Sequence, residues 1–347
     1  MFYILLVISF FLVLFSIAPI KFEKSKLFWI YLFGFIFFLI ATFRPEGLDN
    51  DFLIYKDLFL NMKYESHEMI EPTFYVITKT INFFSSDYRY FFLIYAGLSV
   101  FIKLFAIRKI SSFYFLSLLI WLCNSFILHD MTQIRASVGA ALMLVSIIPL
   151  VNNNRKGFFI MAFFAVLFHF SSLIILPFIL LKTDKFNHKI WLSLIPIAYI
   201  MIFLGFSPLE FYRIIPIQTI QAKMQAYILF QEMDSKDVVN IFSLLVFLKI
   251  LIILFFSFNI KKIYEQNRYA IICLKIYIIS VFLLISFSKV IAVSLRLSEL
   301  TGVVEIVLIP MLIFGVKPKY KLVAISFVIF YALLLFYLHI RSETLNF

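Results

Sequence analysis

Long apolar runs recur along the sequence and constrain its fold more than any other feature. An α-helix of roughly 20 apolar residues spans a bilayer, and continuous runs exclude a transmembrane β-barrel, whose strands alternate in short segments. Hydrophobic residues make up 63% of the chain, which excludes an ordinary soluble domain. The runs lie at 2–20, 27–43, 88–107, 112–128, 131–151, 157–181, 189–206, 238–260, 269–288, 296–316 and 320–339.

We therefore predict an all-α polytopic integral membrane protein with about 10–12 transmembrane or re-entrant helices, as one integral domain of residues 1–347. The first run lacks a basic n-region and a small-residue cleavage site, so we expect a retained helix rather than a signal peptide. The two cysteines, Cys123 and Cys273, lie inside apolar runs and indicate core packing.

The basic residues predict the orientation, because cytoplasmic loops of membrane proteins are rich in Lys and Arg. All the basic linkers can share the cytoplasmic side on two conditions. The amphipathic piece 71–84 must not cross fully, and the segment 157–181 must enter and return, broken near 168–172. The N-terminus and the loops near 44–87 and 207–237 are then extracytoplasmic. The linkers are Lys21/Lys24/Lys26, Arg108/Lys109, Arg155/Lys156, Lys182/Lys185/Lys189, Lys261/Lys262/Arg268 and Lys317/Lys319/Lys321.

Several function classes find no support in the sequence. The net charge of +12 resides in short linkers, so it does not form the basic patch with interleaved aromatics that nucleic-acid binding needs. Motifs for a P-loop, a Rossmann cofactor, a redox or zinc CxxC pair and an HExxH metal site are absent. We expect no nucleic-acid partner, no cofactor and no metal.

Arg44 follows the second apolar run directly, and Pro45 and Gly47 predict a sharp turn at the membrane surface. A guanidinium there could bind a phosphate in bidentate fashion, with Asp49 and Asp51 close by. The alternative is a solvated acidic loop.

The stretch "LHDMTQIRASVGAAL" at 128–142 introduces polar side chains into an apolar region. On a regular helix, His129 and Gln133 share one face, and Thr132 and Arg135 form the adjoining one. Small residues after Arg135 permit close helix packing. An arginine here is either functional or a snorkelling residue at the interface.

His169 interrupts the apolar segment "VLFHFSSLIILP" at 166–177, where the topology requires a break. Its imidazole can exchange a proton near neutral pH. The alternative is a satisfied core histidine.

Arg296 and Glu299 lie three residues apart and can pair on one helical face, with Glu305 deeper in the same run. The alternative to a functional site is a structural ion pair. The 207–237 loop carries a polar stripe that predicts an interfacial helix with a weak role in substrate contact.

The ordered set "RPEGLDNDFLIYKDLF", "EPTFYVITKTI", "QIRASVGAALMLVSI", "AVLFHFSSLIILPFIL" and "RLSEL…IP" resembles the EpsG family. That family is grouped with the Wzy-type polymerases of bacterial surface polysaccharide, such as O-antigen or capsule. The resemblance covers most of the chain and implies a GT-C-like membrane fold in the bacterial cytoplasmic membrane.

The resemblance also implies a metal-independent glycosyltransferase that acts at the outer leaflet. Its partners would be undecaprenyl-diphosphate-linked oligosaccharide, membrane lipid and a chain-length regulator. The hydroxyl at the non-reducing end of one repeat unit would attack the anomeric carbon of a second chain. Undecaprenyl diphosphate would then leave.

Side-chain chemistry suggests roles within this reaction. Arg44, Arg135 and Arg296 would stabilise the departing diphosphate, with Gln133 and Glu299 as further substrate-binding residues. The general base would be His169 first, Asp49 second and His129 third. The alternatives are a flippase or secondary transporter, a glycan ligase and a membrane O-acyltransferase.

Overall fold

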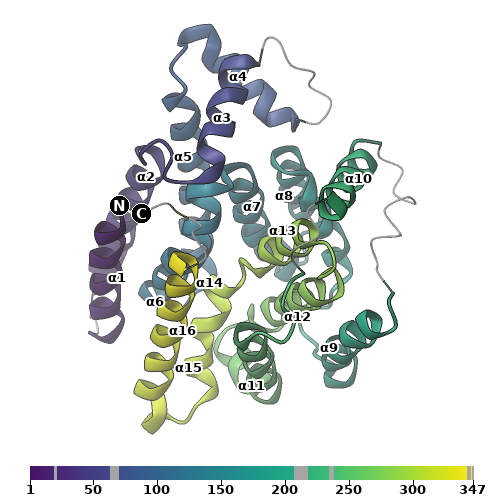
Figure 1. Cartoon of the computed structure of the whole chain (residues 1–347). Helices are drawn as coiled ribbons and strands as arrows, with labels where there is room; N and C mark the ends of the chain where they lie inside the picture. The colour runs from purple at the N-terminus through teal and green to yellow at the C-terminus, as the bar shows by residue number, and fades with distance from the viewer. Residues whose placement is uncertain (19–21, 63–69, 207–217, 234–237, 342–344, 346–347) are drawn as a thin grey trace.

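The computed structural model describes residues 1–347 except 19–21, 63–69, 207–217, 234–237, 342–344 and 346–347 (Figure 1). The expected loops near 44–87 and 207–237 are therefore described in part. The helices in chain order are α1 (Phe2–Ile17), α2 (Glu23–Thr42), α3 (Asn50–Asn61), α4 (Pro72–Phe84), α5 (Arg89–Ile110), α6 (Tyr114–Trp121), the π-helix η1 (Leu122–Thr132), α7 (Ile134–Val151), α8 (Arg155–Phe168), the 3₁₀-helix η2 (Phe170–Leu180), α9 (His188–Phe203), α10 (Gln218–Met233), α11 (Leu244–Gln266), α12 (Ala270–Ser286), α13 (Ile291–Gly302), α14 (Glu305–Leu308), η4 (Ile309–Met311), α15 (Leu312–Gly315), η5 (Pro318–Tyr320) and α16 (Lys321–Arg341).

The described residues form helices and no strands, which confirms the all-α prediction. Among them, seven helical segments are long and apolar enough to cross a membrane. Four shorter apolar helices accompany them, namely α1, η2, α9 and α12. Helices satisfy every backbone hydrogen bond within one segment, which a chain in hydrocarbon requires. The chain is a multi-pass membrane protein.

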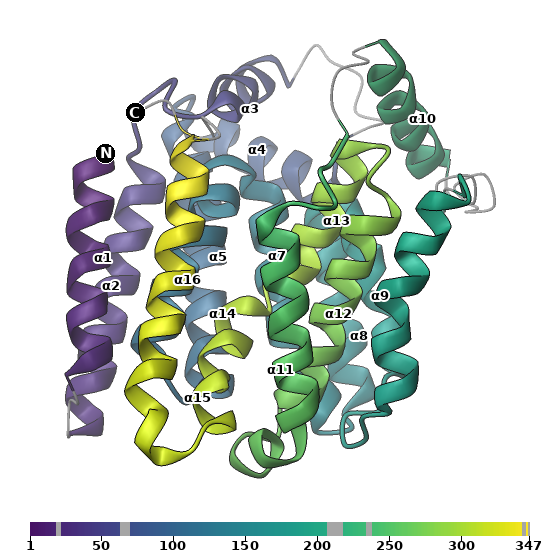
Figure 2. The ribbon, with the colours of Figure 1, turned by 60° about the horizontal axis from the view of Figure 1, so that its bottom comes forward.

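The helices run between two faces of the bundle. The α11–α12 and α15–α16 linkers lie at the bottom of the view in Figure 2, while α3, α4 and α10 lie at the top. We call the bottom, with its lysines and arginines, the basic face, and the top the opposite face. The piece predicted at 71–84 is the 13-residue helix α4. At 1.5 Å per residue its length is roughly 20 Å, which is too short to cross.

The predicted break near 168–172 is present. Helix α8 ends at Phe168, His169 is extended (φ −157°, ψ 116°), and η2 packs back along α8. The Thr73 hydroxyl donates a 2.7 Å hydrogen bond to the Leu167 carbonyl, which satisfies a backbone group that the ended helix leaves open. Gly139 of α7 lets this segment approach closely, because a Cβ there would lie 2.7 Å from Ser172 Oγ.

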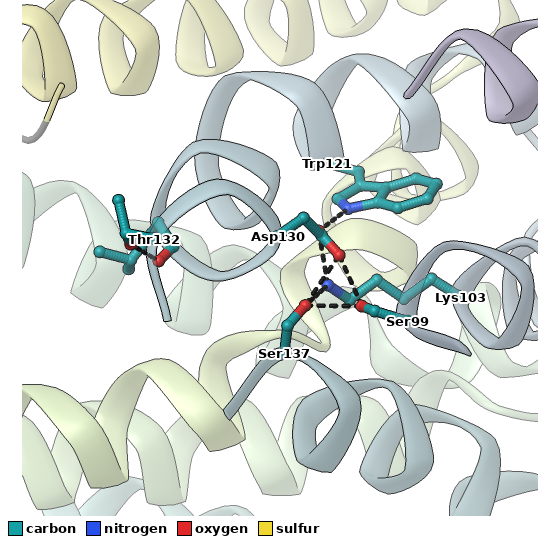
Figure 3. A network of polar contacts seen from close by, with 7 residues as sticks. Ser99, Lys103, Trp121, Asp130, Thr132 and Ser137 are labelled. Atoms are coloured by element: carbon teal, nitrogen blue, oxygen red, sulfur yellow. Dashed lines mark hydrogen bonds and ion pairs between the residues drawn. The ribbon is translucent and has the colours of Figure 1, made fainter. Parts of the chain in front are cut away.

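A buried ion pair ties the centre of the bundle together (Figure 3). Lys103 Nζ of α5 lies 2.7 Å from Asp130 Oδ2 of η1, and neither side chain is exposed. Trp121 Nε1–H donates to the same Oδ2 oxygen at 2.8 Å, and the hydroxyls of Ser99 and Ser137 donate to Oδ1. Both charges are thus paired and hydrogen-bonded, the condition under which burial is tolerated.

We predict that Lys103→Met destabilises the folded protein by about 3–5 kcal/mol, because it leaves the Asp130 carboxylate buried without a counter-ion. The double variant Lys103→Met/Asp130→Leu is expected to recover most of this loss. The measurement is the thermal unfolding midpoint of the purified protein in detergent. Lys56→Met is the matched control, since Lys56 pairs with Glu46 at the exposed surface and should change little. A Lys103→Met protein as stable as the wild type would contradict this account.

Candidate functional site

Three side chains from distant segments meet on the opposite face, and we call them the Glu71 cluster: Glu71, Arg135 and His169. Glu71 immediately precedes α4, Arg135 lies in the first turn of α7, and His169 forms the break between α8 and η2. Arg135 Nη1 donates to Glu71 Oε2 in an ion pair. His169 Nδ1 lies 3.5 Å from the other carboxylate oxygen, Oε1. The Glu71 side chain is 1% exposed.

The guanidinium of Arg135 is held on more than one side. Its carbon lies 5.3 Å from the centre of the Tyr55 ring and 5.4 Å from that of Phe74. These distances are within range of cation–π attraction. The Arg135 side chain is 22% exposed. Its Nε atom is buried and has no hydrogen-bond partner in the protein. Arg135 is therefore fixed by the protein yet accessible to a ligand.

Arg296 and Asp51 lie outside the Glu71 cluster, and each interacts electrostatically with its Arg135. Arg296 of α13 lies over the Tyr227 ring of α10, 4.7 Å from its centre. Asp51 of α3 lies within the fields of Arg296, Arg135 and Arg44. Burial raises the pKa of Asp51, and repulsion from Asp49 adds to this rise, while the three arginines oppose it.

Arg44 and Asp49 are joined to each other. Arg44 Nε donates to Asp49 Oδ2 at 2.8 Å, and both side chains are almost fully buried. Nη1 of the same guanidinium donates to the Ala41 carbonyl, and its carbon lies 4.4 Å from the centre of the Phe92 ring. The predicted turn is present, with Gly47 at φ +75°.

Asp49 also caps α3 by accepting the N–H of Asp51 at 3.1 Å. Burial lowers the pKa of Arg44 and raises that of Asp49, and each group opposes the shift of the other. This arrangement gives both residues a structural role, and the solvated-loop alternative does not describe them. Their roles as phosphate ligand and second-choice base stay predictions.

A cavity of about 400 Å³ lies between η1, α11, α13 and α16. Its wall residue His129 is close enough to His169 of the Glu71 cluster for the two imidazoles to interact electrostatically. His129 and Glu299 line it, together with Lys249 and Asn124. Lys249 Nζ lies 2.7 Å from Glu305 Oε1, and Asn124 Nδ2 donates to Glu305 Oε2 at 3.1 Å. Glu305 is thus paired. The sequence had indicated that burying this carboxyl group in an apolar run costs free energy unless it has a partner.

Among the described residues, no group of three or more His, Cys, Asp and Glu side chains could hold a metal ion.

A family model matches residues 26–347, almost the whole chain. The chain belongs to the EpsG family. This family is linked to polysaccharide biosynthesis. No curated protein and no solved structure matches the chain significantly.

Two details of this EpsG-family chain differ from the sequence prediction. The regular helix assumed for 128–142 is wrong, because η1 is a π-helix that ends at Thr132 and Gln133 separates it from α7. The chain reverses there, so the face-sharing pairs do not form as expected. Arg296 and Glu299 are also not within ion-pair distance of each other. Arg296 lies over Tyr227, whereas Glu299 lines the cavity and has Gln133 nearby.

The structure thus distributes the predicted residues over two neighbouring places. Arg135 and His169 meet in the Glu71 cluster with Arg296 near it, while His129 and Glu299 belong to the cavity. Sequence reasoning named Asp51 beside Arg44 without giving it a role, and it did not select Glu71, Asn124, Lys249 or His339. Lys249 carried a usable signal, since a lone lysine inside an apolar run is a functional candidate by default. Glu71 carried a weaker one, its position immediately before Pro72.

The raised pKa of Asp51 predicts a pH-dependent stability. A folded state that raises a carboxyl pKa binds its proton more tightly than the unfolded state. The contribution of Asp51 to the free energy of unfolding is therefore present at acidic pH, and it is lost as the pH rises through the pKa of Asp51 in the folded protein. Asp51→Asn should therefore raise the unfolding midpoint at pH 8, by about 2 °C or more. It should have little effect near pH 4.

Asp57→Asn is the matched control for this measurement, because Asp57 lies on the same helix with an exposed side chain. The account requires the difference between Asp51→Asn and wild type to grow with pH. A difference that is constant across the pH range would show that burial of the Asp51 charge is not its cause.

Proposed function

We propose that this EpsG-family protein is a glycosyltransferase that polymerises lipid-linked repeat units of a bacterial surface polysaccharide. The observation that carries the proposal is the Glu71 cluster, with Arg296 and Asp51 around it, on the face opposite the basic linkers. The positive-inside rule predicts that the basic face is cytoplasmic. The cluster would then face the outer leaflet of the cytoplasmic membrane, where undecaprenyl-diphosphate-linked glycans would be joined.

The reaction needs stabilisation of a departing diphosphate. The acceptor hydroxyl oxygen forms a bond to the anomeric carbon of the donor, and the bond from that carbon to the diphosphate oxygen breaks. Undecaprenyl diphosphate leaves with the electron pair. Arg135 and Arg296 suit this charge, because preorganised guanidinium groups stabilise oxyanions that develop in the transition state. Arg44 has one buried nitrogen, Nη2, without a partner and would contribute through its field.

The reaction also needs a group that accepts the hydroxyl proton. His169 fits, because its Nδ1 faces Glu71 at 3.5 Å and its Nε2 would be left to take the proton. Glu71 would orient the ring and stabilise the imidazolium that forms, as carboxylate–histidine pairs do in other enzymes. Asp49 is the second candidate and His129, whose ring lies in the cavity wall, the third.

The test begins with deletion of the gene in its own host and complementation with variants, followed by gel analysis of the surface glycan. Deletion should collapse the glycan ladder to single repeat units. We predict that His169→Ala and Arg135→Ala reduce polymer formation by about 10²-fold or more. Arg135→Lys keeps the charge but loses the two-nitrogen fork, so it should recover only part of the activity.

Arg108→Ala is the matched control for the arginine variants. Arg108 lies on the basic face and donates to the Tyr31 hydroxyl at 2.8 Å, so its loss should leave the ladder intact. Protein abundance in the membrane is measured for each variant. Three results would overturn the proposal: a normal ladder in correctly inserted His169→Ala and Arg135→Ala cells, accumulation of intact lipid-linked polymer after deletion, or an unchanged ladder with altered mass per repeat. The second result indicates a ligase or exporter, and the third a modifying enzyme.

A further inference from the structure

The cavity beside the Glu71 cluster contains buried polar atoms that the protein leaves unpaired. His129 Nδ1, Ser125 Oγ and Glu299 Oε2 are buried, lack a hydrogen-bond partner and belong to residues of the cavity wall. His129 is only 2% exposed. A buried polar group without a partner costs about 1–3 kcal/mol. Three such atoms in one cavity indicate a site whose partners come from a ligand.

The remaining polar wall is rigidly arranged. Lys249 and Asn124 both bond Glu305, and His339 Nε2 lies 3.0 Å from Asn124 Oδ1. These contacts join α11, η1, α14 and α16 around the cavity. A binding site whose lining is fixed before the ligand arrives loses less entropy on binding. The volume of about 400 Å³ is within the usual range for small-molecule sites.

The charges of the cavity disfavour a phosphate. Among the described residues that line it, the ammonium group belongs to Lys249 and is already paired with Glu305. Glu299 adds a second acidic side chain. A hydrocarbon chain fits no better, since it would leave the three unpaired atoms unsatisfied. Hydroxyl groups suit them, because each hydroxyl can donate to a carboxylate or imidazole nitrogen and can also accept.

We propose that this cavity binds the uncharged terminal sugars of the acceptor glycan, with sugar hydroxyls paired to Glu299 Oε2, Ser125 Oγ and His129 Nδ1. The inference rests on the proposed function, whose acceptor site it assigns. Helix α13 links the two places, since Arg296 lies toward the Glu71 cluster and Glu299 lies one turn further on in the cavity. The acceptor end would thus lie next to the diphosphate of the donor.

The test measures binding without turnover. Neutral disaccharides are prepared by partial acid hydrolysis of the host's own surface polysaccharide and titrated into the purified protein in detergent, with saturation-transfer NMR as the readout. Wild type should bind them. Glu299→Gln should raise the Kd at least about 10-fold, because an amide replaces the carboxyl group whose Oε2 would bind a sugar hydroxyl. Ser125→Leu, which fills the cavity, should abolish binding.

Ser125→Ala removes only the unpaired hydroxyl, so it shows whether the protein tolerates change at this position if Ser125→Leu fails to fold. It should fold normally and weaken binding measurably. Ser146→Ala is the matched control, since Ser146 is buried in α7 and donates to the Met143 carbonyl. It should bind as wild type does.

Absence of binding to wild type, or equal binding by wild type, Glu299→Gln and Ser125→Leu, would overturn the inference. Displacement of the sugar signal by a short-chain polyprenol would also overturn it, because the cavity would then hold a lipid tail. The ladder assay reports separately on polymerisation. Sugar binding that depends on Glu299 in a protein whose deletion leaves the ladder unchanged would refute the proposed function and keep the sugar site.

Discussion

The carboxylate of Glu71 is the contact on which the opposite face of the protein depends. It has little access to solvent, and each oxygen faces a different group, one Arg135 and the other His169. These partners come from the start of α7 and from the break after α8. Without the carboxylate, the half-buried Arg135 and His169 would lie together without a counter-charge, which is costly where solvent is largely excluded. The same contact orients the two side chains that the proposed chemistry uses.

The break that supplies His169 is possible because protein surrounds it. Irregular backbone at membrane depth is tolerated only when it is buried in protein or lines a cavity. Here α4 covers the break through Thr73, and α7 approaches it at Gly139. The Lys103–Asp130 pair holds α5 and η1 together. The fold thus pairs Lys103 with Asp130 and Lys249 with Glu305 inside the bundle.

Much of the architecture follows from the sequence alone, because apolar runs and basic linkers are local features. The runs predict the helices, and the requirement for consistent loops predicts both the short helix at 71–84 and the break near His169. What could not be predicted are the partners. A single sequence does not indicate which charges meet when the two partners lie far apart in the chain. This holds for Glu71 with Arg135, Lys103 with Asp130 and Lys249 with Glu305. The π-helix η1 was also missed, since its residues show the same apolar composition as a regular helix.

The most direct test of the central claim uses the purified protein in lipid nanodiscs with the lipid-linked repeat unit as sole substrate. Products are separated and identified by mass spectrometry. The account predicts glycans of two or more repeat units on the lipid carrier, with one undecaprenyl diphosphate released for each unit added. It also predicts that Glu71→Gln, which removes the charge that stabilises protonated His169, slows this release. A repeat unit that stays unextended while the wild-type protein is folded, or undecaprenyl diphosphate release without chain growth, would contradict the account.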